Sequence, residues 1–169
     1  MKTPSRIYLR HPELADQRAF LAAVRASQAL HRPWVKPPST PLQFVSYVQQ
    51  AIAPAHCGFL VCRRDDDDLA GVVTISNIVA GAFRSGYLGY YAFAGSAGQG
   101  LLGEGLLAAV RHAFRSLKLH RLEANIQPGN VRSLALVQAC GFSREGYSPR
   151  YLKIGGRWRD HERWAIVAS

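Results

Sequence analysis

Residues 94–104 read Ala94-Gly95-Ser96-Ala97-Gly98-Gln99-Gly100-Leu101-Leu102-Gly103-Glu104, a glycine-rich segment between a predicted strand and a predicted helix. Its glycines allow a ligand to approach the main chain closely, and the first turn of a helix offers unpaired N–H groups. Together with the positive end of the helix dipole, these groups favour the binding of phosphate oxygens. A plain connecting loop is the alternative interpretation.

Two known nucleotide-binding loops are excluded. A P-loop needs Gly-Lys-Ser or Gly-Lys-Thr after the glycines, and this segment continues with Gly103-Glu104. A dinucleotide-binding fingerprint needs an acidic residue at the end of a second parallel strand about 20 residues later, and the sequence does not supply one. Any phosphate site here is therefore of another kind.

The residues on either side of this segment predict one α/β domain over residues 1–169. After the loop, apolar residues at helical spacing form one broad face: Leu102, Leu106, Val110, Phe114 and Leu117. The order of elements is a strand, two helices, three strands, a helix, a strand, a helix and two strands, which predicts a mixed sheet. The predicted strands are 7–10, 58–63, 69–79, 85–94, 121–126, 147–154 and 158–167, and the predicted helices are 12–30, 40–53, 102–117 and 130–140.

The charge balance indicates a polyanionic partner. The 169 residues include 21 Lys and Arg against 11 Asp and Glu, a formal net charge of +10. Such a surface suits nucleic acid, a phosphate-bearing cofactor or an anionic membrane face, and it does not choose between them. The four aspartates at 65–68 lack the ligand spacing of an EF-hand and predict a charged turn.

The sequence also predicts a cytoplasmic protein without metal or membrane contact. No apolar region follows the basic residues at the start of the chain, and the most apolar stretch, residues 69–83, is too short for a bilayer. Three cysteines, Cys57, Cys62 and Cys140, fit a reducing compartment. An odd separation within one strand directs Cys57 and Cys62 to opposite faces, which argues against a metal pair.

Further motifs accompany the glycine loop. Residues 98–104 are similar to Gly-Lys-Gly-x-x-x-Glu, and residues 128–133 are similar to Pro-x-Asn-x-x-Ser. With the element order, these motifs resemble the GNAT acetyltransferases, and within them the RimJ/RimL class that acetylates protein N-termini. The resemblance runs from residue 7 to about residue 168. Its more specific motifs are Gly71-Val72, Ser76-Asn77, Tyr87-Leu88-Gly89-Tyr90, Gly141-Phe142, Glu145-Gly146, Tyr151-Leu152 and Trp158-Arg159-Asp160-His161.

The chain departs from the superfamily pattern at three positions. Ala97 replaces a glutamine or arginine, and Leu102 replaces a small residue of the phosphate loop. Binding through main-chain N–H groups survives these changes, whereas a side-chain contribution at position 97 is lost. The tyrosine that often serves as general acid in the superfamily would fall near Val137.

The resemblance implies the GNAT fold: a mixed, mostly antiparallel sheet of about seven strands with four helices, in which strands 85–94 and 121–126 splay apart. Acetyl-CoA would enter that wedge as co-substrate. The cofactor-binding residues that the resemblance implies are Tyr91, Ala92, Phe93, Gly98, Gln99, Gly100, Leu101, Leu102, Gly103 and Asn130.

Ser133 is the expected catalytic residue, its hydroxyl protonating the thiolate leaving group in place of a tyrosine. Asn130 also suits a helix N-cap and Ser133 a first helical turn, so structural roles are the alternative. For Glu104, a favourable interaction with the helix dipole is preferred to a catalytic role.

The expected acceptor is the N-terminal amine of a protein, an alanine of a ribosomal protein of the S5 type. An α-amine with a pKa near 7.7–8.0 needs less help from a base than a lysine near 10.4, and no dedicated base stands out. The proline-rich residues 33–38 and the hairpin turn at 155–156 would wall a peptide groove. Its expected substrate-binding residues are Trp34, Asn77 and Tyr151.

Two alternatives stay open at this stage. A GNAT enzyme could instead acetylate a small amine, such as an amino acid, a polyamine or an antibiotic. A ribosome-associated assembly factor could keep the fold with weak catalysis, since a basic surface suits ribosomal RNA as well as the phosphates of CoA.

Overall fold

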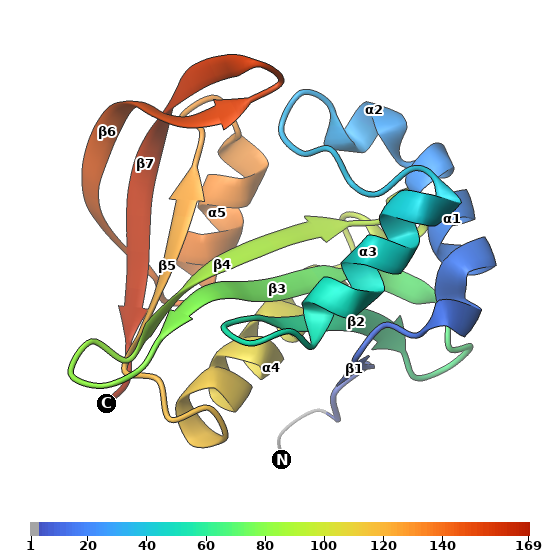
Figure 1. Ribbon diagram of the computed structural model, residues 1–169, viewed down its shortest axis with the longest axis horizontal. Coiled ribbons are helices and arrows are strands. Elements are labelled where there is room, and N and C mark those ends of the chain that lie inside the picture. Colours follow the sequence, from blue (N-terminus) through green and yellow to red (C-terminus); the bar gives the residue numbers. More distant parts are fainter. Residues whose placement is uncertain (1–3) are drawn as a thin grey trace.

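The computed structural model describes residues 4–169, which form a seven-stranded mixed sheet in the order β1-β2-β3-β4-β5-β7-β6 (Figure 1). All neighbouring strands are antiparallel except β4 and β5. The predicted sheet is therefore confirmed. Its strands are β1 (Ile7–Arg10), β2 (Cys57–Arg63), β3 (Leu69–Val79), β4 (Ser85–Ala92), β5 (Arg121–Ile126), β6 (Ser143–Ile154) and β7 (Arg157–Val167).

Helices cover both faces of the sheet. Over the described part of the chain they are α1 (Gln17–Ala26), α2 (Gln28–His31), α3 (Pro41–Ala51), α4 (Leu101–Arg115) and α5 (Val131–Ala139). The first predicted helix, 12–30, is divided at Ser27, which explains five helices where four were expected. The Ser27 hydroxyl donates to the Ala23 carbonyl (2.6 Å) and accepts from the Ala94 N–H (2.8 Å), so it ties the break to the end of β4. Within residues 4–169, no helix is long and apolar enough to cross a membrane.

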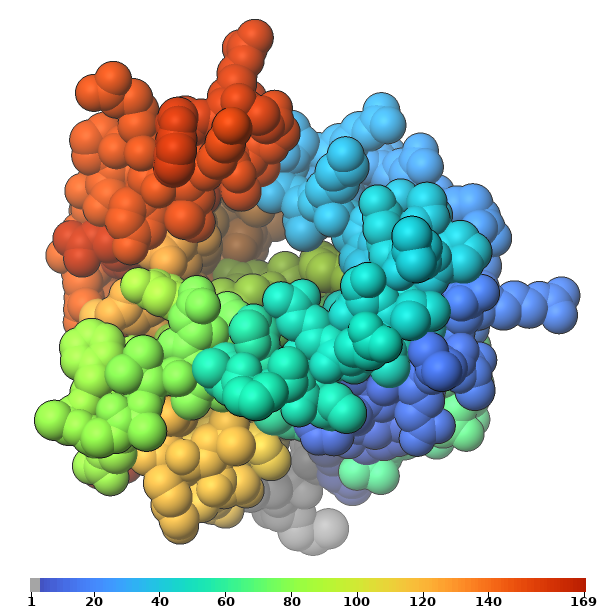
Figure 2. All heavy atoms as spheres, viewed as in Figure 1, coloured from blue at the N-terminus to red at the C-terminus, as the bar shows by residue number. Residues whose placement is uncertain are grey.

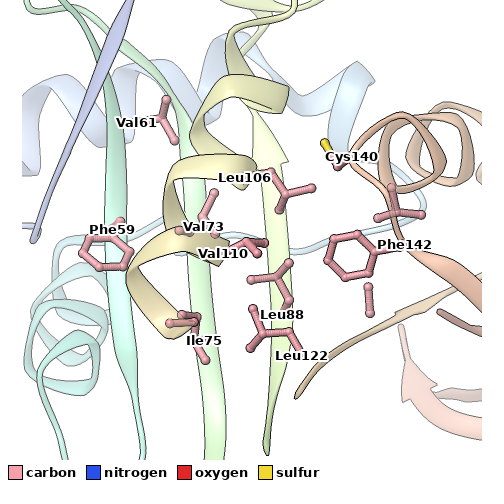
Figure 3. Close-up of a cluster of buried hydrophobic side chains, with 14 of the residues drawn as sticks. Phe59, Val61, Val73, Ile75, Leu88, Leu106, Val110, Leu122, Cys140 and Phe142 are labelled. Atoms are coloured by element: carbon pink, nitrogen blue, oxygen red, sulfur yellow. The ribbon is translucent and has the colours of Figure 1, made fainter. Parts of the chain in front are cut away.

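Alternation along the strands divides the interior into two hydrophobic clusters, one on each face. On β2, Phe59 and Val61 pack with Leu106 of α4 and with neighbouring strands (Figure 3), whereas Leu60 and Cys62 pack with Phe20 and Phe44 of α1 and α3. Cys57 belongs to the α4 cluster, so Cys57 and Cys62 point to opposite faces as predicted.

The parallel pair β4 and β5 separates after a short contact. The paired residues are Ser85 with Arg121, Gly86 with Leu122 and Tyr87 with Glu123, whereas β4 continues to Ala92 and β5 to Ile126. Figure 1 shows the two strands diverging, with the β6–β7 hairpin on one side and α1 to α3 on the other. The predicted wedge is thus present in the middle of the sheet.

Helix α4 lies directly on β2 because Gly105 has no side chain. A Cβ atom at Gly105 would lie 2.6 Å and 2.9 Å from the two methyl carbons of Val61, both deep in the core. This contact sets the distance between α4 and the sheet. The glycine loop connects the end of β4 to the start of α4. The packing of one glycine therefore helps to set the position of the loop.

Replacing Gly105 with alanine is expected to lower the free energy of unfolding by about 1–3 kcal/mol, measured by urea denaturation. The steric clash with Val61 outweighs the gain of about 1 kcal/mol in helix propensity. In the double variant Gly105→Ala/Val61→Ala, the clash is relieved, so the loss should be smaller than the sum of the two single losses. Additive losses would show that the two residues are not in tight contact.

Candidate functional site

The glycine loop places an uncapped helix terminus at the end of β4. Gly98 and Gly100 have φ angles of 75° and 77°, in the left-handed region that favours glycine. Gly100 is the N-cap of α4 and has no side chain with which to cap the first turn. Among residues 4–169, no side chain caps these N–H groups, so they can bind an anion. Leu101 is buried within the core and anchors the turn.

Arg6 places a positive charge beside this loop. Its guanidinium donates to the Gln99 carbonyl (3.0 Å) and to the Glu104 carboxylate (2.7 Å), and its main-chain N–H donates to the same carboxylate (2.9 Å). Burial alone would raise the pKa of Glu104, but the hydrogen bonds from Arg6 lower it overall. Glu104 thus links Arg6 to α4, and its expected interaction with the helix dipole stays a prediction.

Along the edge of β4 that faces the wedge, only every second residue directs its main-chain N–H and C=O groups into the wedge. The Phe93 N–H donates to the Ala70 carbonyl on β3 (2.9 Å), and the Arg84 carbonyl accepts from the His120 N–H on the β5 side (2.6 Å). Since main-chain groups alternate along a strand, Leu88, Tyr90 and Ala92 direct theirs toward the wedge.

Of the three residues expected to pair with the cofactor, Tyr91 and Phe93 therefore direct their main-chain groups to β3, and Ala92 alone lies on the open edge. The buried ring of His31 already donates from Nε2 to the Ala92 carbonyl (2.7 Å). The sequence motif located the correct segment of β4, but only the pairing of Phe93 with Ala70 defines which residues face the wedge.

Across the wedge, the N-terminus of α5 presents Ser133. The Asn130 side chain caps this helix by accepting from the Ser133 N–H (3.3 Å), so its structural role is realised. The Ser133 hydroxyl lies 2.6 Å from the Tyr90 hydroxyl of β4. Burial raises the pKa of Tyr90 to about 12, and the contact with Ser133 opposes this increase. Val137, where the tyrosine of the superfamily pattern would fall, is fully buried in the core.

A second hollow lies on the opposite face of β3 and β4. It is a cavity of about 570 Å³ between α3, the segment 35–38 and the strands. Figure 2 shows the surface hollowed on this side, with residues of β4 at the bottom and the β6–β7 hairpin beyond. Within residues 4–169, no aspartate or glutamate lines it. The lining residues are Val35, Lys36, Pro37, Pro38, Leu42, Gln43, Ser46, Tyr47, Gln50, Ala51, His56, Val72, Thr74, Ser76 and Tyr91.

Tyr47 brings an unusual hydroxyl to this cavity. Its oxygen is buried and has no hydrogen-bond partner among the described residues. Burial raises the pKa of Tyr47 and also that of Tyr91, so both hydroxyls stay protonated and uncharged at neutral pH. A buried, uncompensated hydroxyl is costly, which suits a group that receives a ligand.

None of the three expected substrate-binding residues lines the cavity. Trp34 packs its ring against Gly129 in the β5–α5 loop, 3.1 Å from the position that a Cβ atom would take. Asn77 is exposed, with a φ angle of 49°, at an irregularity of β3. Tyr151 of β6 lies beside His161, with ring centres 6.2 Å apart, and its contact with Tyr87 raises the pKa of Tyr87.

Sequence reasoning missed three residues of this region: His31, Tyr47 and Tyr90. Tyr47 lies within a predicted helix, Tyr90 lies within a motif that carries the resemblance, and His31 follows the end of the first predicted helix. No local pattern assigned any of them to the site. The polar atoms of His31 and Tyr90 acquire a role through contacts with residues 61 and 43 positions away, which no local signal reveals. Across residues 4–169, no group of three or more His, Cys, Asp or Glu side chains converges as metal ligands do.

Comparisons with known proteins agree on one family. The family model of the acetyltransferase (GNAT) domain matches residues 6–143. The ribosomal protein uS5-alanine N-acetyltransferase of Escherichia coli K12 is 44% identical over 103 residues, which cover 61% of this chain and 53% of that enzyme. "Probable N-acetyltransferase YjcK" of Bacillus subtilis is 36% identical over 109 residues, covering 64% of this chain and 60% of that protein.

A solved structure extends the likeness over nearly the whole chain. RimJ of Mycobacterium smegmatis, in complex with CoA-disulfide, superposes with a TM-score of 0.87 and 30% identity, covering 96% of this chain and 82% of that one. The chain spans a little over half the length of the curated relatives it matches, 53% and 60%.

The lone hydroxyl of Tyr47 predicts an unusual stability effect. Tyr47→Phe removes a buried hydroxyl that lacks a partner, so the free energy of unfolding should stay constant or rise by about 1 kcal/mol. In contrast, Tyr90→Phe removes a hydroxyl bonded to Ser133 and should lower it by about 1 kcal/mol. Equal losses in the two variants, measured by urea denaturation, would contradict the difference between the two sites.

Proposed function

This chain belongs to the GNAT acetyltransferase family, and we propose that it transfers the acetyl group of acetyl-CoA to the N-terminal amine of a protein. The acceptor we propose is an N-terminal alanine of a ribosomal protein of the S5 type. The observation that carries this proposal is the wedge between β4 and β5, whose open edge leads to an uncapped helix terminus. The likeness to the uS5-alanine N-acetyltransferase of Escherichia coli supports the choice of acceptor.

Acetyl-CoA binds in this proposal with its pyrophosphate on the loop of residues 98–103. The free N–H groups of the first turn of α4 receive the phosphate oxygens, and Arg6 holds the loop in place through the Gln99 carbonyl and the Glu104 carboxylate. The pantetheine arm then runs along the open edge of β4, where Tyr90 and Ala92 present main-chain groups. The cap residue Asn130 holds the start of α5 against the far side of the arm.

The chemistry is direct attack of a neutral amine on the thioester carbonyl. A main-chain N–H on the open edge of β4 polarises the carbonyl and stabilises the developing oxyanion. Ser133, at the start of α5, supplies the proton that the thiolate leaving group needs. The amine approaches from the cavity on the other face of the sheet, so donor and acceptor reach the reacting carbon from opposite sides.

The composition of the cavity favours a peptide over a polyamine. A polyamine site needs carboxylates to hold the amines that stay charged, and the lining contains neutral hydroxyl and amide side chains with Lys36 and His56. These groups suit the polar main chain and small side chains of an extended N-terminus. An α-amine is already largely neutral near pH 8, so no strong base is required.

The phosphate site is tested by Gly100→Glu, with Gly100→Ala as matched control. Both variants place a side chain at a positive φ angle, but only glutamate adds a negative charge beside the phosphates. The glutamate variant should bind acetyl-CoA about tenfold or more weakly than the alanine variant, measured by calorimetry, which corresponds to about 1.4 kcal/mol. Equal affinities of the two folded variants for acetyl-CoA would show that its phosphates do not bind at this loop.

The acceptor is tested with a peptide panel and acetyl-CoA, read by mass spectrometry. A peptide with N-terminal alanine should be acetylated once, and blocking its α-amine while its lysines stay free should abolish the reaction. Activity should fall as pH drops below about 7.7–8.0, because the amine becomes protonated. Modification of lysine, or turnover only with a free amino acid or polyamine, would assign the enzyme to small or side-chain amines instead.

A further inference from the structure

One hydrogen bond connects β4 to the start of α5, beyond the last β4–β5 pair. The Tyr90 hydroxyl reaches from β4 to the Ser133 hydroxyl at the start of α5, at 2.6 Å, and lies 3.5 Å from the Ser133 carbonyl. β5 leads through the β5–α5 loop to Ser133 in α5, so this contact joins the two sides of the gap that opens after Tyr87. The shorter distance identifies the two side-chain hydroxyls as the principal pair.

The surroundings of Tyr90 hold its hydroxyl in place and keep it protonated. The ring packs against the core cluster under α4 and α5, which restricts its movement. Burial raises the pKa of Tyr90 to about 12, so the hydroxyl carries its proton throughout the physiological range. The nearby titratable group is Cys140, whose thiol pKa is also raised by burial, so it stays neutral as well.

The direction of the hydrogen bond follows from the two hydroxyl groups. A phenol is a stronger donor than an aliphatic alcohol, and the alcohol oxygen is the better acceptor. Tyr90 therefore donates to Ser133, and the proton of Ser133 is left free for another acceptor. Without this contact, the Ser133 hydroxyl can rotate among its staggered rotamers, and its proton has no fixed direction.

We propose that Tyr90 is a positioning residue for acetyl transfer, holding the Ser133 hydroxyl so that its proton faces the thiolate of CoA. This inference rests on the function proposed above and adds a residue to its machinery. Tyr90 acts through Ser133 and keeps its own proton during the reaction.

The step balances without any further reactant. The amine nitrogen forms a bond to the acetyl carbon, the carbon–sulfur bond breaks, and its electron pair leaves with sulfur. Ser133 gives its proton to that thiolate and regains one from solvent, while the amide nitrogen releases its surplus proton to solvent. The sum is one amine and one thioester converted to one amide and one thiol.

The first test is steady-state kinetics of Tyr90→Phe. Loss of the positioning contact should lower kcat about tenfold and leave the KM for acetyl-CoA within about twofold, since the interaction acts on the departing thiolate. The double variant Tyr90→Phe/Ser133→Ala should be no slower than Ser133→Ala alone, because Tyr90 works only through Ser133. The matched control is Tyr8→Phe, which removes a tyrosine hydroxyl bonded to Asp67 at the far edge of the sheet.

A change of leaving group separates this role from a structural one. The oxygen-ester analogue of acetyl-CoA releases an alkoxide, which needs a proton more than a thiolate does. The kcat ratio of wild type to Tyr90→Phe should therefore be larger with the ester than with the thioester. An equal ratio for both donors, or a double variant slower by the product of the single effects, would overturn the assignment.

A fold-preserving variant covers the case in which Tyr90→Phe does not fold. 3-Fluorotyrosine at position 90 keeps the ring and the hydroxyl but ionises at lower pH, so the alkaline loss of kcat should move to lower pH than in wild type. An unchanged alkaline profile would contradict a role for the Tyr90 proton. If wild type itself transfers no acetyl group to any amine, the proposed function fails; if wild type is active and both Tyr90 variants match it, only this inference fails.

Discussion

The separation of β4 from β5 after the Tyr87–Glu123 pair is the constraint on which the site depends. It leaves main-chain N–H and C=O groups of β4 without a strand partner in the middle of a sheet, where unpaired polar groups are costly. The protein satisfies one of them itself, because His31 donates to the Ala92 carbonyl. The remaining groups form a polar edge that suits the amides of a pantetheine arm.

The elements around the wedge follow from this opening. β4 leads into the glycine loop and the uncapped start of α4, while β5 leads into α5 and brings Ser133 to face Tyr90. The contacts that connect the two sides include the Tyr90–Ser133 hydrogen bond and the packing of Trp34 on Gly129. The cavity lined by Tyr47 lies on the opposite face of the sheet from the Tyr90–Ser133 contact. β4 borders both the wedge and this cavity.

Local patterns were sufficient to predict most of the fold. The bounds predicted for β3 and β5 agree with the structure, helical spacing located α4, and the glycines marked the loop that precedes α4. The break at Ser27 was missed because its cause, a hydrogen bond to Ala94, lies 67 residues away. The main-chain groups of Tyr91 and Phe93 were expected in the wedge, yet the register with β3 assigns that edge to Tyr90 and Ala92. Trp34, Asn77 and Tyr151 were predicted as one groove, but whether they share a surface depends on tertiary packing that no motif encodes.

Amide hydrogen exchange by NMR, with and without acetyl-CoA, tests the role of the open edge most directly, because neighbouring residues of β4 serve as internal controls. The N–H groups of Tyr90 and Ala92 face the wedge, so their exchange should slow on binding. Those of Tyr91 and Phe93 already face β3 and should exchange at unchanged rates. Saturating acetyl-CoA that leaves Tyr90 and Ala92 unprotected would show that the donor binds elsewhere.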